Sequence, residues 1–262
     1  MNDFFHWLKR WRQNYSLGYF ANQHGILQRF LREQGNWEPH LSISRQAILS
    51  EVDRLKPKTV AIFGSGWLLD VPLKELIEQG IRVKLFDIAH PTKLVNKYKG
   101  VESIEFIDFD LTFGAVHEVK SFLQKPSSFK FELLIDNIKN TSSSNAFNYD
   151  LVVSINTLSQ LHAPFIDAFE NRKSLSKYSL VELIEAFQTL HIKSLPKGKS
   201  LLITELYEEI LDLKSKLQSE SPRVYINLTG FEKVNEWNWQ FDTQSTYIDD
   251  FSVRKRVGAY RV

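Results

Sequence analysis

Two short apolar runs, joined by a turn and an amphipathic segment, organise the pattern of hydrophobic and polar positions along this chain. Residues 60–63 and 83–86 are each dominated by Val, Ile, Leu and Phe. A strand that is buried in a parallel sheet is apolar on both faces, so both runs predict such strands. Between them, the large apolar residues of 69–77 share one face of a predicted helix, which Asp70 is expected to cap and Gly80 to end.

The turn after the first run and the acid after the second carry candidate chemistry. Gly64, Ser65 and Gly66 follow the first strand, and two glycines one residue apart let backbone N–H groups approach a ligand closely. Asp87 ends the second strand, where an acid accepts hydrogen bonds from a ribose diol. These features predict a nucleotide-type half-site. The dinucleotide fingerprint has a third glycine where this chain has Leu69, so a tight turn without a ligand stays open as an alternative.

Further apolar runs extend the predicted sheet and end in polar groups. Three more strands are expected, at residues 104–107, 151–155 and 200–206. Because ligands of open α/β sheets bind at the carboxyl ends of the strands, the residues that follow the third and fourth strands are candidates for the site. They are Asp110, Leu111, Asn156 and Thr157.

The N-terminal residues have a helical pattern. Apolar and aromatic residues recur at helical spacing in three segments of 1–57, which predict a helical cap over the sheet. Packing alone is the preferred explanation of the aromatic stripe, and a membrane-surface helix is disfavoured because the stripe carries few arginines. We expect residues 58–262 to form the sheet domain, with an insertion at about 125–148. The polar candidates of the cap for contacting a substrate are Tyr15, Tyr19, His24 and His40.

The C-terminal part of the sequence predicts two more helices and a final hairpin. Residues 179–192 have one apolar helical face, and the charged segment 207–219 is expected to be a surface helix. Two late strands, 234–241 and 253–262, have no helix between them. This order predicts a reversed hairpin at the end of the sheet.

Composition and charge narrow the classes of function. A formal net charge of +2 over 262 residues leaves no electrostatic footprint for nucleic acid, so no nucleic-acid partner is expected. The chain has no cysteine, its seven histidines lack ligand spacing, and we expect no metal site. No apolar run approaches the ~20 residues of a membrane span. We therefore expect a cytoplasmic protein without a membrane partner. Its oligomeric state is not indicated.

The order of elements from about residue 45 to 262 resembles the class I S-adenosylmethionine-dependent methyltransferases. That resemblance implies a Rossmann-like α/β fold: a doubly wound, seven-stranded, mostly parallel sheet with a reversed C-terminal β-hairpin, here with an N-terminal helical cap. It implies S-adenosylmethionine as cofactor, with Gly64, Ser65, Gly66 and Asp87 at its methionine and ribose parts. The other implied contacts are Ile88 and Leu111 at the adenine ring, Asp110 at its amino group, and Asn156 with Thr157 at the donor methyl.

The expected reaction is methyl transfer to a small-molecule acceptor. Asn156 departs from the signature of enzymes that methylate base amines, which argues against a nucleic-acid base as the acceptor. His162, just beyond the fourth strand, is the candidate general base, although a structural role is the simpler explanation for a lone histidine. Two alternatives stay open: an NAD(P)-dependent oxidoreductase, and a catalytically degenerate Rossmann-like binding module.

Overall fold

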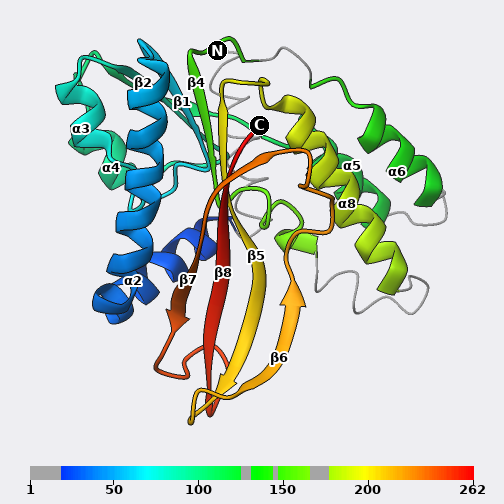
Figure 1. The fold of residues 1–262 in the computed structure, drawn as a ribbon. Helices are drawn as coiled ribbons and strands as arrows, with labels where there is room; N and C mark the ends of the chain where they lie inside the picture. The colour runs from blue at the N-terminus through cyan, green and yellow to red at the C-terminus, as the bar shows by residue number, and fades with distance from the viewer. Residues whose placement is uncertain (1–18, 125–130, 144–146, 166–176) are drawn as a thin grey trace.

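A computed structural model describes residues 19–124, 131–143, 147–165 and 177–262 (Figure 1). Its elements in chain order are α2 (Tyr19–Leu55), β1 (Thr59–Phe63), α3 (Leu73–Glu78), β2 (Arg82–Asp87), α4 (Thr92–Lys97), β3 (Ile104–Asp108), α5 (Ala115–Gln124), α6 (Phe131–Asn140), β4 (Leu151–Ile155), η2 (Ala163–Phe165), α8 (Lys177–Ser194), β5 (Ser200–Asp212), β6 (Leu217–Pro222), β7 (Glu232–Asp242) and β8 (Phe251–Arg261).

One twisted sheet runs through the molecule. Its strand order is β3-β2-β1-β4-β5-β8-β7, with β6 paired to β5 off this path. The first five strands in this order are parallel, and β8 is antiparallel to both β5 and β7. The mixed α/β fold and the reversed hairpin are therefore confirmed. The predicted count of seven strands is wrong, because the described residues form a sheet of eight.

The eighth strand lies where the sequence predicted a surface helix. Strand β5 continues to Asp212, and the chain then turns into β6, which pairs with it. The surface helix predicted at 207–219 is therefore wrong. Two of the charged residues that suggested a helix form ion pairs inside the sheet region instead of facing water. Glu208 forms an ion pair with Arg223, and Glu209 forms one with Arg254 of β8. Both glutamates are buried.

Helices cover both faces of the sheet (Figure 1). Helices α2, α3 and α4 lie on one face, and α5, α6 and α8 lie on the other. The predicted insertion thus contains a helix, α6, whose apolar residues pack into the same cluster as α8. The part of the insertion around residues 144–146 lies outside the described residues.

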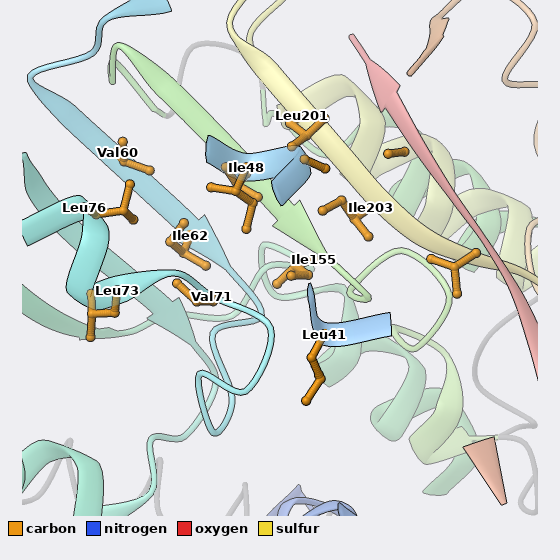
Figure 2. Packing of buried hydrophobic residues seen from close by; sticks show 14 of the residues in the cluster. Leu41, Ile48, Val60, Ile62, Val71, Leu73, Leu76, Ile155, Leu201 and Ile203 are labelled. Carbon is orange, nitrogen blue, oxygen red and sulfur yellow. The ribbon is translucent and has the colours of Figure 1, made fainter. Parts of the chain in front are cut away.

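Helix α2 is a single element with Pro39 inside it, where the sequence predicted separate helices. Figure 2 shows Leu41 and Ile48 of this helix in the same cluster as the apolar side chains of β1, β4 and β5. The buried carboxylate of Glu51 also accepts a hydrogen bond from Arg261 at 2.6 Å. Apolar burial and this ion pair therefore attach α2 to the sheet, and α2 forms one wall of the cleft described below.

Candidate functional site

A cleft of about 240 Å³ lies at the carboxyl ends of the parallel strands. Loops after β1, β2, β3 and β4 form its floor, and side chains of α2 and β7 form a wall. The structure thus brings to one cleft residues that the sequence separates by more than ninety positions. The residues predicted to contact a cofactor all line it: Gly64, Ser65, Gly66, Asp87, Ile88, Asp110, Leu111, Asn156 and Thr157.

The two glycines of the turn serve different purposes. Gly64 has a φ of +77°, and a Cβ there would lie 2.2 Å from the Thr157 hydroxyl oxygen and 2.8 Å from the Ile155 carbonyl oxygen. Gly64 is therefore required by the close approach of the turn to the end of β4. At Gly66 a Cβ would meet only the Gly64 carbonyl oxygen, at 3.9 Å. The open space beside Gly66 belongs to the cleft.

Asp87 connects the end of β2 to the glycine turn. The Gly66 N–H donates to Asp87 Oδ2 at 2.8 Å, and the Ile88 N–H donates to Oδ1 at 2.8 Å. Burial raises the pKa of Asp87, and these backbone donors oppose the shift. Each carboxylate oxygen has two lone pairs, so both oxygens can still accept from a ligand hydroxyl. The carboxylate is held in place before any ligand arrives.

Asp110 is positioned by the chain that follows it. Its carboxylate accepts hydrogen bonds from the Thr112 N–H at 2.8 Å, the Thr112 hydroxyl at 2.6 Å and the Gly114 N–H at 3.0 Å. These bonds order the turn that leads into α5. Asp108, the last residue of β3, is not among the lining residues of the cleft. Asp110 and Leu111 do line the cleft, and their contact with an adenine ring stays a prediction.

Asp70 lines the cleft, and its predicted role as the cap of the following helix is wrong. It does not cap α3, which begins at Leu73 with Pro72 at the N-cap and no side-chain cap bond. Instead Asp70 Oδ2 accepts a hydrogen bond from Asn156 Nδ2 at 3.1 Å, and burial raises the pKa of Asp70 to about 6. The signal for this placement was Pro72, which is favoured at the start of a helix and puts Asp70 too early to cap.

Asn156 has an unusual backbone and an unused acceptor. Its φ is +51°, a conformation that favours glycine, aspartate and asparagine. Its Oδ1 atom is buried and has no hydrogen-bond partner among the described residues. An unpaired buried acceptor is costly, so a ligand donor at this position would be favoured. Asn156 Oδ1 and the Asp70 carboxylate together provide acceptors at the end of β4.

The remaining predicted site residues are distributed differently. His40 lines the cleft, on the α2 wall. His162 is buried but is not among the lining residues, and burial lowers its pKa to about 4, with Arg223 adding to the effect. Tyr15 lies outside the described residues. Tyr19 begins α2, and its side chain is also outside the description.

The described residues contain neither a metal-binding cluster nor a membrane-spanning helix. No group of three or more His, Asp or Glu residues in this part of the chain has the arrangement to hold a metal ion. None of the helices described is long and apolar enough to cross a membrane.

Comparisons with known proteins give structural neighbours only. No family model and no curated protein matches the chain. A 1,6-didemethyltoxoflavin-N1-methyltransferase from Burkholderia thailandensis is 11% identical and matches 93% of this chain and 89% of its own, with a TM-score of 0.40. The N-methyltransferase NodS from Bradyrhizobium japonicum WM9 is 13% identical and matches 87% of this chain and 98% of its own, with a TM-score of 0.42. These similar structures are methyltransferases.

Proposed function

We propose that this chain is an S-adenosylmethionine-dependent methyltransferase acting on a small-molecule acceptor. The observation that carries the proposal is the hydrogen bond from the Gly66 N–H to the Asp87 carboxylate. It joins a glycine turn after β1 to an acid at the end of β2 within one cleft. That combination suits a nucleoside whose ribose hydroxyls donate hydrogen bonds to the acid while the rest of the ligand lies beside the glycine turn.

The donors and acceptors of the cleft fit this cofactor. Asp87 offers lone pairs to ribose hydroxyls, and the space beside Gly66 admits a ligand chain. The unpaired Asn156 Oδ1 suits the ammonium group of the methionine part. Ile88 and Leu111 offer apolar surface for a purine. When bound, S-adenosylmethionine supplies an electrophilic methyl group on a sulfonium sulfur.

The contribution of the protein to such a transfer is mainly positioning, since holding two reactants in line supplies much of the acceleration. A base is needed only if the acceptor arrives protonated. For that case we assign the base to Asp70 in preference to His162, because Asp70 lines the cleft and its pKa of about 6 suits proton uptake. Its hydrogen bond to Asn156 fixes the carboxylate.

Calorimetric titration of the purified chain with S-adenosylhomocysteine, with NADH in parallel, tests the proposal. We expect micromolar binding of S-adenosylhomocysteine and none of NADH. Gly66→Ala should abolish that binding in a folded protein, because the added methyl group would occupy the ligand space. Binding of NADH alone would favour the oxidoreductase alternative, and binding of neither would favour a binding module that has lost its cofactor.

A further inference from the structure

The wall of the cleft formed by α2 and β7 carries two stacked rings. His40 of α2 and Trp239 of β7 lie parallel, with ring centroids 4.0 Å apart and an interplanar angle of 6°. Both residues line the cleft and both are buried. Trp37 adds a third aromatic ring, in edge contact with Trp239 at 4.7 Å. These rings line the cleft beside the residues proposed for the cofactor and are separate from them.

A neighbouring indole fixes the tautomer of His40. Trp237 Nε1–H donates to His40 Nδ1 at 3.0 Å, so Nδ1 carries the lone pair and the ring proton is on Nε2. The ring stays neutral, because burial, followed by the charges of Lys255 and Arg45, lowers the pKa of His40 to about 3. His40 therefore presents an N–H donor at every pH at which the protein would work.

Two N–H groups of this wall lack acceptors. Both His40 Nε2 and Trp239 Nε1 are buried without a hydrogen-bond partner in the described part of the chain. Leaving one buried donor unpaired costs about 1–3 kcal/mol, so two on adjacent rings are a strong departure from ordinary packing. Trp37, in contrast, has its N–H paired with the Phe241 carbonyl oxygen at 3.0 Å.

At His40, the local charge favours an electron-rich ligand group. Lys255 Nζ lies 5.5 Å from the Trp239 ring centroid, and it is paired with Glu205 at 2.9 Å. Lys255 and Arg45 both contribute a positive potential at His40. A carbonyl or carboxylate oxygen would gain from this potential and from the free donors. An ammonium group would be stabilised neither by the positive potential nor by the N–H donors.

We propose that His40 Nε2–H and Trp239 Nε1–H bind a carbonyl or carboxylate oxygen of a flat acceptor substrate, which lies against the aromatic wall. The proposal rests on the proposed function, because it treats this end of the cleft as the acceptor side. It names the class of acceptor: a planar, oxygen-bearing compound. In this arrangement Trp237 is a positioning residue, since it acts only by holding the tautomer of His40.

Three probes that share one ring test the proposal: benzoate, benzamide and benzylamine, titrated into the full chain with and without S-adenosylhomocysteine. Binding is followed by the indole N–H signals in ¹H–¹⁵N spectra, with the Trp239 signal assigned from its loss in Trp239→Phe. We expect benzoate and benzamide to bind and to shift the Trp239 signal downfield. Benzylamine, which has no acceptor oxygen, should bind at least about tenfold more weakly.

Variants test whether benzoate binding depends on the N–H donors or only on the size of the rings. Trp239→Phe removes an N–H without an acceptor and should weaken benzoate binding about tenfold. His40→Phe keeps a ring while removing its donor and should also weaken binding about tenfold, but it removes the acceptor of the Trp237 N–H as well, so Trp239→Phe is the decisive variant. Trp67→Phe is the matched control, because this cleft residue already donates its N–H to the Gln23 carbonyl oxygen at 2.9 Å. It should change benzoate binding by less than about threefold. Equal losses in Trp67→Phe and Trp239→Phe would overturn the proposal.

The result also separates this proposal from the cofactor assignment. If S-adenosylhomocysteine binds the wild-type chain but all three probes bind equally or not at all, the oxygen subsite is refuted and the cofactor proposal stands. If benzoate binds with the expected variant pattern and S-adenosylhomocysteine does not, the subsite stands and the cofactor proposal fails.

Discussion

Replacing Asp87 by alanine tests the proposed ribose contact. A hydrogen bond to a charged group contributes about 1.5–3 kcal/mol, and a ribose diol can make two to this carboxylate. Part of that gain is offset because the carboxylate already accepts hydrogen bonds from the N–H groups of Gly66 and Ile88. We therefore expect Asp87→Ala to weaken S-adenosylhomocysteine binding by about 1–3 kcal/mol, which is about 5- to 150-fold in Kd.

The structure also defines the control for this experiment. Asp87→Ala leaves the N–H groups of Gly66 and Ile88 without their acceptors, so the glycine turn itself could shift. Asp87→Asn keeps one acceptor oxygen and the shape of the side chain, and it should lose less affinity than alanine. Calorimetry measures each Kd, and thermal unfolding reports whether each variant is folded. Unchanged affinity in a folded Asp87→Ala protein would refute the assignment of this acid.

Three other predictions concern stability. Gly64→Ala should lower the free energy of unfolding by about 2–4 kcal/mol, because its Cβ would lie 2.2 Å from a hydroxyl oxygen. The matched Gly66→Ala should lower it by only about 1 kcal/mol. Equal losses of stability in urea unfolding would contradict this distinction between the two glycines. The folded pKa of Asp70, about 6, lies above its ordinary value of 3.8, so the folded state binds this proton more tightly and stability falls as pH rises from about 4 to 6. Asp70→Asn should therefore stabilise the protein by about 1–2 kcal/mol at pH 7 and leave it unchanged at pH 4; a loss of stability at pH 7 would count against the burial of a charged Asp70. Arg261→Met should cost about 1–3 kcal/mol by removing a partner of the buried Glu51, and adding Glu51→Leu should recover part of that cost; a double variant less stable than the single one would show that the ion pair is not the cause.

The sheet was predictable because its strands carry their own signal. The runs that became β1, β2 and β4 are mostly apolar, with Lys84 in β2 and Ser154 in β4 as exceptions, and a strand buried on both faces favours that pattern. Glycines and acids directly after such strands lie at one edge of the sheet for geometric reasons alone. The nine predicted contact residues therefore reach one cleft, although their role in binding stays a prediction.

Other features depended on partners distant in sequence. Two of the charges that suggested a surface helix at 207–219, those of Glu208 and Glu209, are paired with Arg223 and Arg254, which the local pattern does not reveal. The apolar spacing predicted separate helices in this region, but residues 19–55 form the single helix α2, which packs against β7, and this contact lies far away in the sequence. The aromatic wall was hidden for a similar reason, since His40 and Trp239 are about two hundred residues apart and meet only across the sheet.

A crystal structure of the full chain with S-adenosylhomocysteine tests the central claim most directly. The account predicts the ligand in the cleft, with its ribose hydroxyls within hydrogen-bond distance of Asp87 and its methionine part beside Gly66 and Asn156. The aromatic wall of α2 and β7 should remain open for an acceptor. A ligand bound elsewhere, or a ribose turned away from Asp87, would contradict the assignment of this cleft.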